Sequence, residues 1–251
     1  MCTVILLRRP SAAWPVIFAG NRDEMRDRPW RTPDRHWPDR PEVVAGQDEL
    51  AGGSWLGVNE HGLLACILNR YGSLGPAAGK RSRGELVLEA LDHADAAAAA
   101  EALAQLEPAA YRSFNLVIAD SRDAFWLRHL GEDAESVVVQ PLPPGISMIT
   151  AADRNDTKSP RIRHFLPQFR QAAAPDPEAG DWGAWETLLA SREHDPAVGA
   201  EGAMNVALPN GFGTVSSSLL ALPAPGSNGG MPLWRFAAGP PDVAAYEAVD
   251  L

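Results

Sequence analysis

The chain has 251 residues, of which 45% are hydrophobic and 22% are charged, values that exclude a disordered chain and indicate a globular protein. Its formal net charge of -10 repels phosphate backbones and anionic lipid surfaces, so nucleic acid is not an expected partner. The length by itself allows one large domain or two small ones.

The chain contains only two cysteines, Cys2 and Cys66, too few for a disulfide framework or a thiolate zinc cage. This count favours a reducing, cytoplasmic setting. No apolar run approaches the roughly 20 residues of a membrane span, and the first run is too short for a signal peptide, so we expect no stable membrane insertion. The histidines are scattered, so we expect no metal site and no required cofactor.

The first third of the chain has the patterns of strands. Residues 3–7 and 14–20 are apolar or β-branched runs, typical of buried strands, and the short link between them predicts a hairpin. Residues 26–41 are rich in proline and charge, which predicts an irregular surface segment. Residues 54–58 and 63–68 predict two more strands joined by a turn.

Helical patterns follow, and then strands again. Ser82 and Glu85 have the spacing of a capping box, which predicts a helix over residues 82–94. An alanine-rich helix is expected from about residue 95 to 106, because Pro108 stops it. Four short strands with turns between them are expected to form a second antiparallel sheet, over residues 114–120, 124–130, 136–142 and 146–150.

The last part of the chain repeats the order of helices and then strands. Apolar residues at helical spacing predict helices over residues 159–172 and 181–194, and strands are expected over residues 213–222 and 232–238. Alternation in blocks is typical of two sheets with helices packed outside them, rather than of a regular doubly wound fold. The sequence therefore predicts an α+β fold in one domain over residues 1–251.

Cys2 lies directly before the first predicted strand. If Met1 is removed, Cys2 carries both a thiol and a free α-amine, which pairs a nucleophile with a base in one residue. A strand behind the cysteine would hold both groups stiffly. The alternative is a small apolar start to a buried strand with Met1 retained, and the local sequence by itself favours that alternative.

Asn21, Arg22, Asp23 and Glu24 end the strand that is expected to pair with the first one. Their side chains are therefore expected beside Cys2. Arg22 would lower the pKa of the thiol and hold a substrate carboxylate, and Asp23 or Glu24 would hold the α-ammonium group or orient Arg22. The alternative is a charged turn, which commonly follows an apolar strand.

These residues resemble the NRDE family, which includes the transport and Golgi organization proteins. The resemblance is carried in order by "MCTVILL", "NRDE", "GGSWLGVNEHGLLACILNR" and "RSRGELV", and it continues through "FNLVIAD", the segment of residues 153–156, "GTVSSSL" and "FAAGPP". It implies the four-layer αββα sandwich of N-terminal-nucleophile (Ntn) hydrolases.

A more distant similarity reaches the choloylglycine hydrolases, the bile-salt and penicillin V amidases. Through their pattern "NEKGL…LN" it implies that Asn69 donates to an oxyanion, and through a helix that opens Ser-x-Arg or Ser-Arg it implies a role for Arg161. The chain has Ala151 where those amidases have a second oxyanion asparagine, so Asn155 or a backbone N–H would have to substitute.

The candidate site thus joins residues from several segments, and the separate roles of the charged residues in "NRDE" are left open. The candidate catalytic residues are Cys2, Arg22, Asp23 and Asn69, and the candidate substrate-binding residues are Asn21, Glu24, Arg70 and Arg161.

Two functions are expected from these residues. The first is an N-terminal cysteine amidohydrolase that acts on the linear C–N amide bond of a small acidic or hydrophobic substrate. The second, implied by the family resemblance, is a carrier without catalysis that binds haem, acyl-CoA or lipid. Trp30, Trp37, Trp55 and Arg70 are its candidate ligand contacts, with core packing as the alternative for Trp55.

Overall fold

The computed structural model describes residues 2–131, 134–226 and 230–251. The chain divides into two compact units, each described below by itself. Unit 1 comprises Met1–Arg28, Pro144–Leu222 and Pro232–Asp250. Unit 2 comprises Pro29–Pro143, Pro223–Met231 and Leu251.

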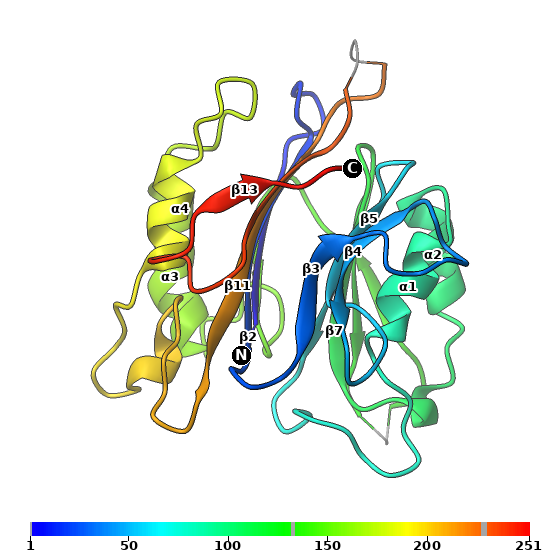
Figure 1. Ribbon diagram of the computed structural model, residues 1–251, viewed down its shortest axis with the longest axis horizontal. Helices are drawn as coiled ribbons and strands as arrows, with labels where there is room; N and C mark the ends of the chain where they lie inside the picture. The colour runs from blue at the N-terminus through cyan, green and yellow to red at the C-terminus, as the bar shows by residue number, and fades with distance from the viewer. Residues whose placement is uncertain (1, 132–133, 227–229) are drawn as a thin grey trace. The chain divides into compact units, whose positions relative to one another are not determined.

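Unit 1 is built on a six-stranded sheet, sheet A, in which every neighbouring pair is antiparallel. The strands stand in the order β10-β1-β2-β11-β12-β13, so β2 and β11 lie side by side in the middle (Figure 1). Their bounds are Thr3–Arg8 (β1), Val16–Met25 (β2), Gly145–Ile149 (β10), Phe212–Leu222 (β11), Leu233–Ala237 (β12) and Tyr246–Ala248 (β13).

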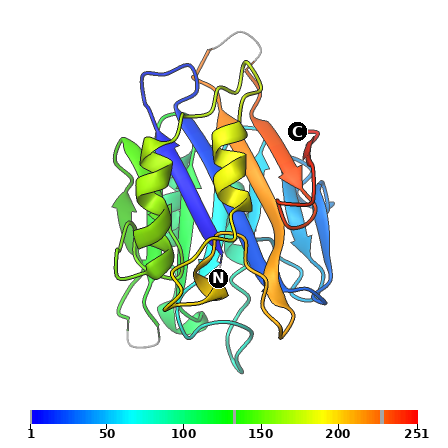
Figure 2. The ribbon, with the colours of Figure 1, turned by 90° about the vertical axis from the view of Figure 1, so that its left-hand side faces the viewer.

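Two helices, α3 (Pro160–Gln171) and α4 (Gly183–Ala190), cover one face of sheet A (Figure 2). The Ser159 hydroxyl caps α3 by accepting from the Ile162 N–H at 3.5 Å, and Pro160 suits the first helical position because it has no N–H to lose. We call the covered side the helix face of sheet A. It is formed by side chains that alternate along the strands, among them Ile5, Leu7, Ile17, Ala19 and Leu219.

Unit 2 is built on a seven-stranded antiparallel sheet, sheet B, in the order β3-β4-β5-β6-β7-β8-β9. Two helices, α1 (Glu85–Leu91) and α2 (Ala96–Leu103), bury their apolar sides against it. The strand bounds are Trp30–Asp34 (β3), Val43–Asp48 (β4), Leu56–Asn59 (β5), Leu64–Asn69 (β6), Phe114–Ala119 (β7), Ala124–His129 (β8) and Val138–Pro141 (β9).

The predicted α+β class with two antiparallel sheets is confirmed. The strands and helices expected from apolar patterns are all present, with shorter bounds for the helices. The predicted single domain over residues 1–251 stays a prediction. Among the described residues, no helix combines the length and the apolar content needed to cross a membrane.

The prediction of an irregular segment over residues 26–41 is wrong for β3. This strand lies at the edge of sheet B and most of it is exposed, so it lacks the apolar run by which buried strands are recognised. Pro33 fits there because an edge strand tolerates a residue without an N–H. The shift in register between Arg31 and Asp34 lies beside this proline.

The expectation that four consecutive strands form one sheet is also wrong. The first three extend sheet B, whereas β10 pairs with β1 in sheet A, with Val4 opposite Ile149. Two segments about 145 residues apart in the sequence form this pair, and local turn signals carry no information about such a partner.

The predicted capping box at α1 does not form. The helix begins at Glu85 and has no side-chain cap; the Ser82 hydroxyl instead accepts from the Gly84 N–H at 3.3 Å. Glu85 accepts a hydrogen bond from the Tyr111 hydroxyl at 2.5 Å and pairs with Arg81. These two partners compete for the carboxylate that the capping box would have needed.

Gly213 is required by a close approach between two backbones. A Cβ at this position would lie 2.7 Å from the carbonyl oxygen of Val206. We expect Gly213→Ala to lower the free energy of unfolding by about 1–3 kcal/mol, the usual effect of overpacking, in urea titrations.

Gly183→Ala is the matched control, because a Cβ there meets only the Asp181 carboxylate, at 3.6 Å. In the first turn of α4 it should leave the stability unchanged or raise it by up to about 1 kcal/mol. Equal stability of the two variants would contradict the close approach.

Candidate functional site

The register of β1 and β2 decides which side chains of the "NRDE" segment lie together. Thr3 stands opposite Asn21, and Ile17 and Ala19 belong to the helix face. Because successive side chains of a strand point to opposite faces, Asn21 and Asp23 also lie on the helix face. Arg22 and Glu24 lie on the other face of β2.

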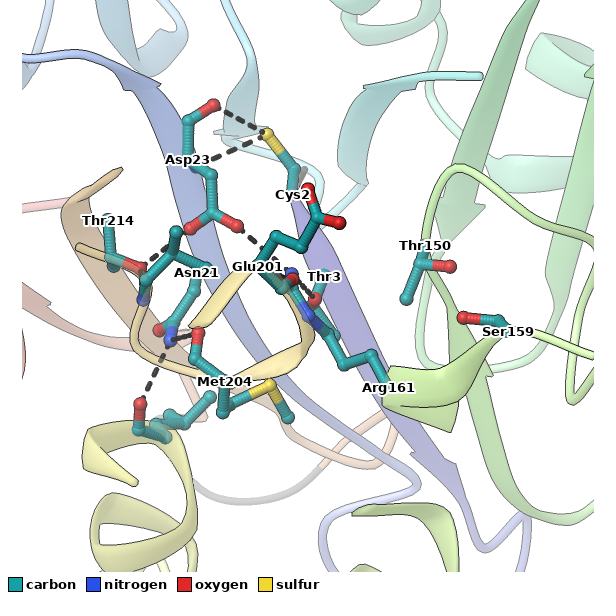
Figure 3. A network of polar contacts seen from close by, with 12 residues as sticks. Cys2, Thr3, Asn21, Asp23, Thr150, Ser159, Arg161, Glu201, Met204 and Thr214 are labelled. Carbon is teal, nitrogen blue, oxygen red and sulfur yellow. Dashed lines mark hydrogen bonds and ion pairs between the residues drawn. The ribbon is translucent and has the colours of Figure 1, made fainter. Parts of the chain in front are cut away.

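Asp23 is the centre of a buried polar cluster (Figure 3). Its carboxylate is fully shielded from solvent and forms an ion pair with Arg161, with 3.0 Å between Oδ2 and Nη1. The same Nη1 donates to the Thr3 hydroxyl at 2.8 Å, and Nη2 donates to the Glu201 carbonyl at 2.9 Å. The Thr214 hydroxyl donates to Oδ1 of Asp23 at 2.7 Å, so both carboxylate oxygens are bonded.

The Cys2 thiol lies against the backbone of Asp23 (Figure 3). Its Sγ accepts from the Asp23 N–H at 3.4 Å and donates to the Asp23 carbonyl at 3.6 Å. Burial raises the pKa of the thiol above its ordinary value, and the negative charge of Asp23 raises it further, although Arg22 acts in the opposite sense. The thiol is therefore protonated at neutral pH.

Asn21 ties β2 to the last turn of α4 and to the segment that follows this helix. Its Nδ2 donates to the carbonyls of Leu189 and Met204, each at 3.0 Å. Its Oδ1 accepts from the Ser217 hydroxyl at 2.6 Å. Both N–H bonds of the amide are thus directed at the main chain, and the expected contact of Asn21 with a substrate stays a prediction.

Arg22 and Glu24 occupy the face of β2 that does not carry Asp23. Arg22 is buried and stands opposite Ser216 on β11. Glu24 accepts from the Met25 N–H at 2.8 Å and forms an ion pair with Arg28 at 3.7 Å. The Asp23 carboxylate is bonded to Arg161 on the opposite face, and the hypothesis that Asp23 or Glu24 orients Arg22 stays a prediction.

Asn69 and Arg70 belong to unit 2, at the end of β6. The Arg70 guanidinium donates to Oδ1 of the buried Asn115 at 2.6 Å, and this oxygen also accepts from the Trp126 indole at 3.1 Å. Arg70 is thus held against its own sheet. The oxyanion role of Asn69 and the substrate contact of Arg70 stay predictions.

Two arginines fix the loop that follows Arg70. Arg112 donates to the carbonyls of Gly72, Leu74 and Gly75 at 2.5, 2.7 and 3.1 Å. Arg83 donates to the Ser73 hydroxyl at 2.8 Å. The loop holds two large exposed apolar side chains, Tyr71 and Leu74, on a backbone whose carbonyls are bonded to guanidinium groups.

The tryptophans proposed as ligand contacts pack within unit 2. Trp55 lies across Gly46, where a Cβ would be 2.4 Å from its ring, and the rings of Trp55 and Trp30 are nearly perpendicular, with 5.7 Å between their centroids. The Trp37 indole donates to the Gly52 carbonyl at 3.1 Å. Core packing, the alternative considered for Trp55, is confirmed.

Asn155, the possible substitute for the missing oxyanion asparagine, is bonded to the backbone of β10, and its oxyanion role stays a prediction. Its backbone is in the left-handed region, with φ of 56°, and its Oδ1 accepts from the Met148 N–H at 2.7 Å. Its Nδ2 donates to the Ile146 carbonyl at 3.3 Å. The side chain therefore acts as a partner for the outer edge of β10, an edge that would otherwise be open for pairing.

Thr214 and Thr3 are the members of the cluster that sequence reasoning missed. Thr214 lies in the motif "GTVSSSL", which supported the family resemblance without a role for the residue. Its role depends on the pairing of β11 with β2. Within the described ranges, no group of three His, Cys, Asp or Glu side chains is placed to hold a metal ion.

The family model of Transport and Golgi organisation 2 matches residues 1–219. The chain belongs to this family. Curated relatives are the Transport and Golgi organization protein 2 homologs of Bos taurus, 36% identical over 113 residues, and Homo sapiens, 34% identical over 113 residues. Each alignment covers 43% of this chain and 40% of the relative, well short of the relative's length.

Three solved structures share the fold. They are the Caenorhabditis elegans ortholog of N-acylethanolamine-hydrolyzing acid amidase (TM-score 0.58, 15% identity, 90% of this chain and 95% of that one), penicillin V acylase from Agrobacterium tumefaciens (0.55, 14%, 100% and 86%) and a variant of conjugated bile acid hydrolase from Clostridium perfringens (0.53, 13%, 100% and 97%). At these identities the likeness shows the fold alone, which is the Ntn-hydrolase fold.

The ion pair between Asp23 and Arg161 leads to a prediction about stability. Arg161→Met leaves a buried carboxylate without its counter-charge, so we expect the free energy of unfolding to fall by about 3–5 kcal/mol in urea titrations. Asp23→Asn added to Arg161→Met should recover part of this loss, because the stranded charge is gone.

Arg192→Met is the control, since Arg192 pairs with Asp242 at 2.6 Å on the surface, where the two side chains are 48% and 28% exposed. Its cost should stay below about 1 kcal/mol. Similar costs for the two arginine variants would contradict the role given to the buried pair.

Arg112→Ala should loosen the loop of residues 71–76, because each lost hydrogen bond removes about 1 kcal/mol of local stability. Chymotrypsin should then cleave faster after Tyr71 and Leu74, as read from the masses of the fragments. The exposed Arg170 on α3 provides the control, Arg170→Ala. Cleavage at the wild-type rate in Arg112→Ala would show that the three carbonyl contacts do not hold the loop.

Proposed function

We propose that this chain is an Ntn-type cysteine amidohydrolase, with Cys2 as the nucleophile, that cleaves linear C–N amide bonds of a small acidic or hydrophobic substrate. The single observation that carries the proposal is the position of the Cys2 thiol against the backbone of Asp23. Its Sγ meets both the N–H and the carbonyl of Asp23, and the side chain of Asp23 is fixed by Arg161 and Thr214.

This arrangement supplies the stiffness that a nucleophile needs. Cys2 directly precedes β1, a strand with a neighbour on each side in sheet A, and its thiol is bonded across to β2. Because folding has already fixed the position of the nucleophile, less entropy is lost when the transition state forms.

The proposal requires the removal of Met1, which lies outside the described residues. The freed α-amine of Cys2, with an ordinary pKa of about 7.7–8.0, then takes the thiol proton directly or through water. The thiolate attacks the amide carbonyl, and the amine of the substrate leaves with the proton that the α-amine of Cys2 had taken up. Water then hydrolyses the thioester to the free acid and the thiol. No cofactor takes part in these steps.

Arg22 is the residue that supports an acidic substrate. It is buried, lies on the same side of the β1–β2 pair as Cys2, and is close enough to lower the pKa of the thiol. A guanidinium in such a position would pair with a substrate carboxylate. The names of the three structural neighbours, an acid amidase, an acylase and a bile acid hydrolase, are consistent with amide substrates of small size.

The alternative of a haem, acyl-CoA or lipid carrier stays a prediction of the family resemblance, and so does the cytoplasmic setting. Two of its proposed ligand contacts are already engaged within unit 2: Trp55 packs against the core, and Arg70 donates a hydrogen bond to Asn115. The contacts of unit 1 around Cys2 favour catalysis as the function to test first.

The test is covalent labelling of Cys2. The intact mass of protein made in cells should show the loss of Met1, and a β-lactam probe should then add one acyl group to the wild-type chain. Cys2→Ala should not be labelled, because the nucleophile is gone. Cys66→Ala is the matched control, since Cys66 is the other cysteine of the chain and lies buried in β6 of unit 2, and it should be labelled like the wild type.

Two results would contradict the proposal. One is equal labelling of wild type and Cys2→Ala. The other is a chain that has lost Met1, keeps its fold and still does not react with lactam or linear amide probes, which would leave the carrier as the better hypothesis.

A further inference from the structure

The segment of residues 200–206 is tied to the polar cluster around Asp23 at three points. The Glu201 carbonyl accepts from Arg161 at 2.9 Å, and the Met204 carbonyl accepts from Asn21 at 3.0 Å. The Val206 N–H donates to the Thr214 hydroxyl at 2.8 Å. The last contact links this segment to Asp23 through one hydroxyl group (Figure 3).

The direction of the hydrogen bonds at Thr214 is fixed by its partners. The hydroxyl oxygen accepts the N–H of Val206, and its single hydrogen goes to Oδ1 of Asp23. The backbone around it is equally constrained, since the Thr214 N–H donates to the Val206 carbonyl at 2.9 Å. The register with β2 shifts between Thr214 and Ser216, a bulge that turns the Thr214 side chain toward Asp23.

Asp23 passes this constraint to the thiol through its own peptide groups. Its Oδ1 is held by Thr214 and its Oδ2 by Arg161, so the side chain has little freedom to rotate. The N–H and the carbonyl that meet Sγ of Cys2 belong to the same residue. A change at Oδ1 therefore acts on the backbone donor of the thiol.

We propose that Thr214 is a positioning residue for the Cys2 thiol and acts through Asp23. Its hydroxyl neutralises part of the carboxylate charge and keeps the Asp23 N–H directed at Sγ. The inference rests on the proposed function for its relevance to catalysis, but the state of the thiol can be measured without any substrate. A failure of the amidase proposal and a failure of this one are therefore distinguishable.

The experiment measures alkylation of Cys2 by iodoacetamide as a function of pH, with the N-terminal peptide followed by mass spectrometry. In Thr214→Val, Asp23 loses a donor, so its charge opposes the thiolate more strongly and its N–H supports the thiolate less. We expect the profile to move to higher pH and alkylation at about pH 8 to slow about threefold, the effect of about half a pKa unit.

Thr214→Ser retains the hydroxyl but lacks the methyl group, and it should show the wild-type profile. If Thr214 acted only through the packing of its methyl group, the serine variant would differ from the wild type. Ser218→Ala is the matched control on the same strand, because the Ser218 hydroxyl accepts from the Trp234 indole at 3.2 Å and does not bond to Asp23. It should leave the profile of Cys2 unchanged.

A wild-type profile in folded Thr214→Val overturns the proposal. A Thr214→Ser variant whose alkylation at about pH 8 is slowed threefold or more also overturns it. This second outcome applies even where the valine variant fails to fold. Circular dichroism and urea titrations of each variant show which of them keep the wild-type fold.

Discussion

The buried ion pair between Asp23 and Arg161 is the interaction on which the rest of unit 1 depends. Removing two charges from water costs several kcal/mol each, and their attraction offsets this cost only when the remaining donors and acceptors are also satisfied. Thr3, Thr214 and the Glu201 carbonyl provide those partners. The need to satisfy one buried pair thus brings together β1, β2, β11, α3 and the segment of residues 200–206.

The same constraint separates the charges of the "NRDE" segment into two environments. The pleat of β2 places Asp23 on the helix face, where Arg161 compensates it, and leaves Arg22 on the side of Cys2. The charge of Arg22 therefore lowers the pKa of the thiol, and the charge of Asp23, whose backbone contacts the thiol, raises it. One residue of shift in the register would exchange the two charges, which explains why a site of this kind belongs to a central strand with fixed pairing.

The sequence was sufficient for the parts of the fold that have local signals. Continuous apolar runs predicted β1 and β2, and helical spacing predicted α3 with its stripe from Ile162 to Phe169. The exposed edge strand β3 has no such run, and the pairing of β10 with β1 joins distant segments. Thr214 lacked a signal for a related reason: a threonine in a strand looks like ordinary β-sheet composition until its partner across the sheet is known.

The raised pKa of Cys2 connects the structure with the condition on Met1. A thiol buried beside a carboxylate is almost entirely protonated at neutral pH, and a protonated thiol is a poor nucleophile. The polar side chains on the helix face near it, Asn21 and Asp23, are already engaged in hydrogen bonds, so none of them is set to accept the proton. The α-amine released with Met1 would be a base of suitable pKa at the required place. In the proposed mechanism, therefore, removal of one residue converts a resting thiol into a nucleophile without any change in the sheet that holds it.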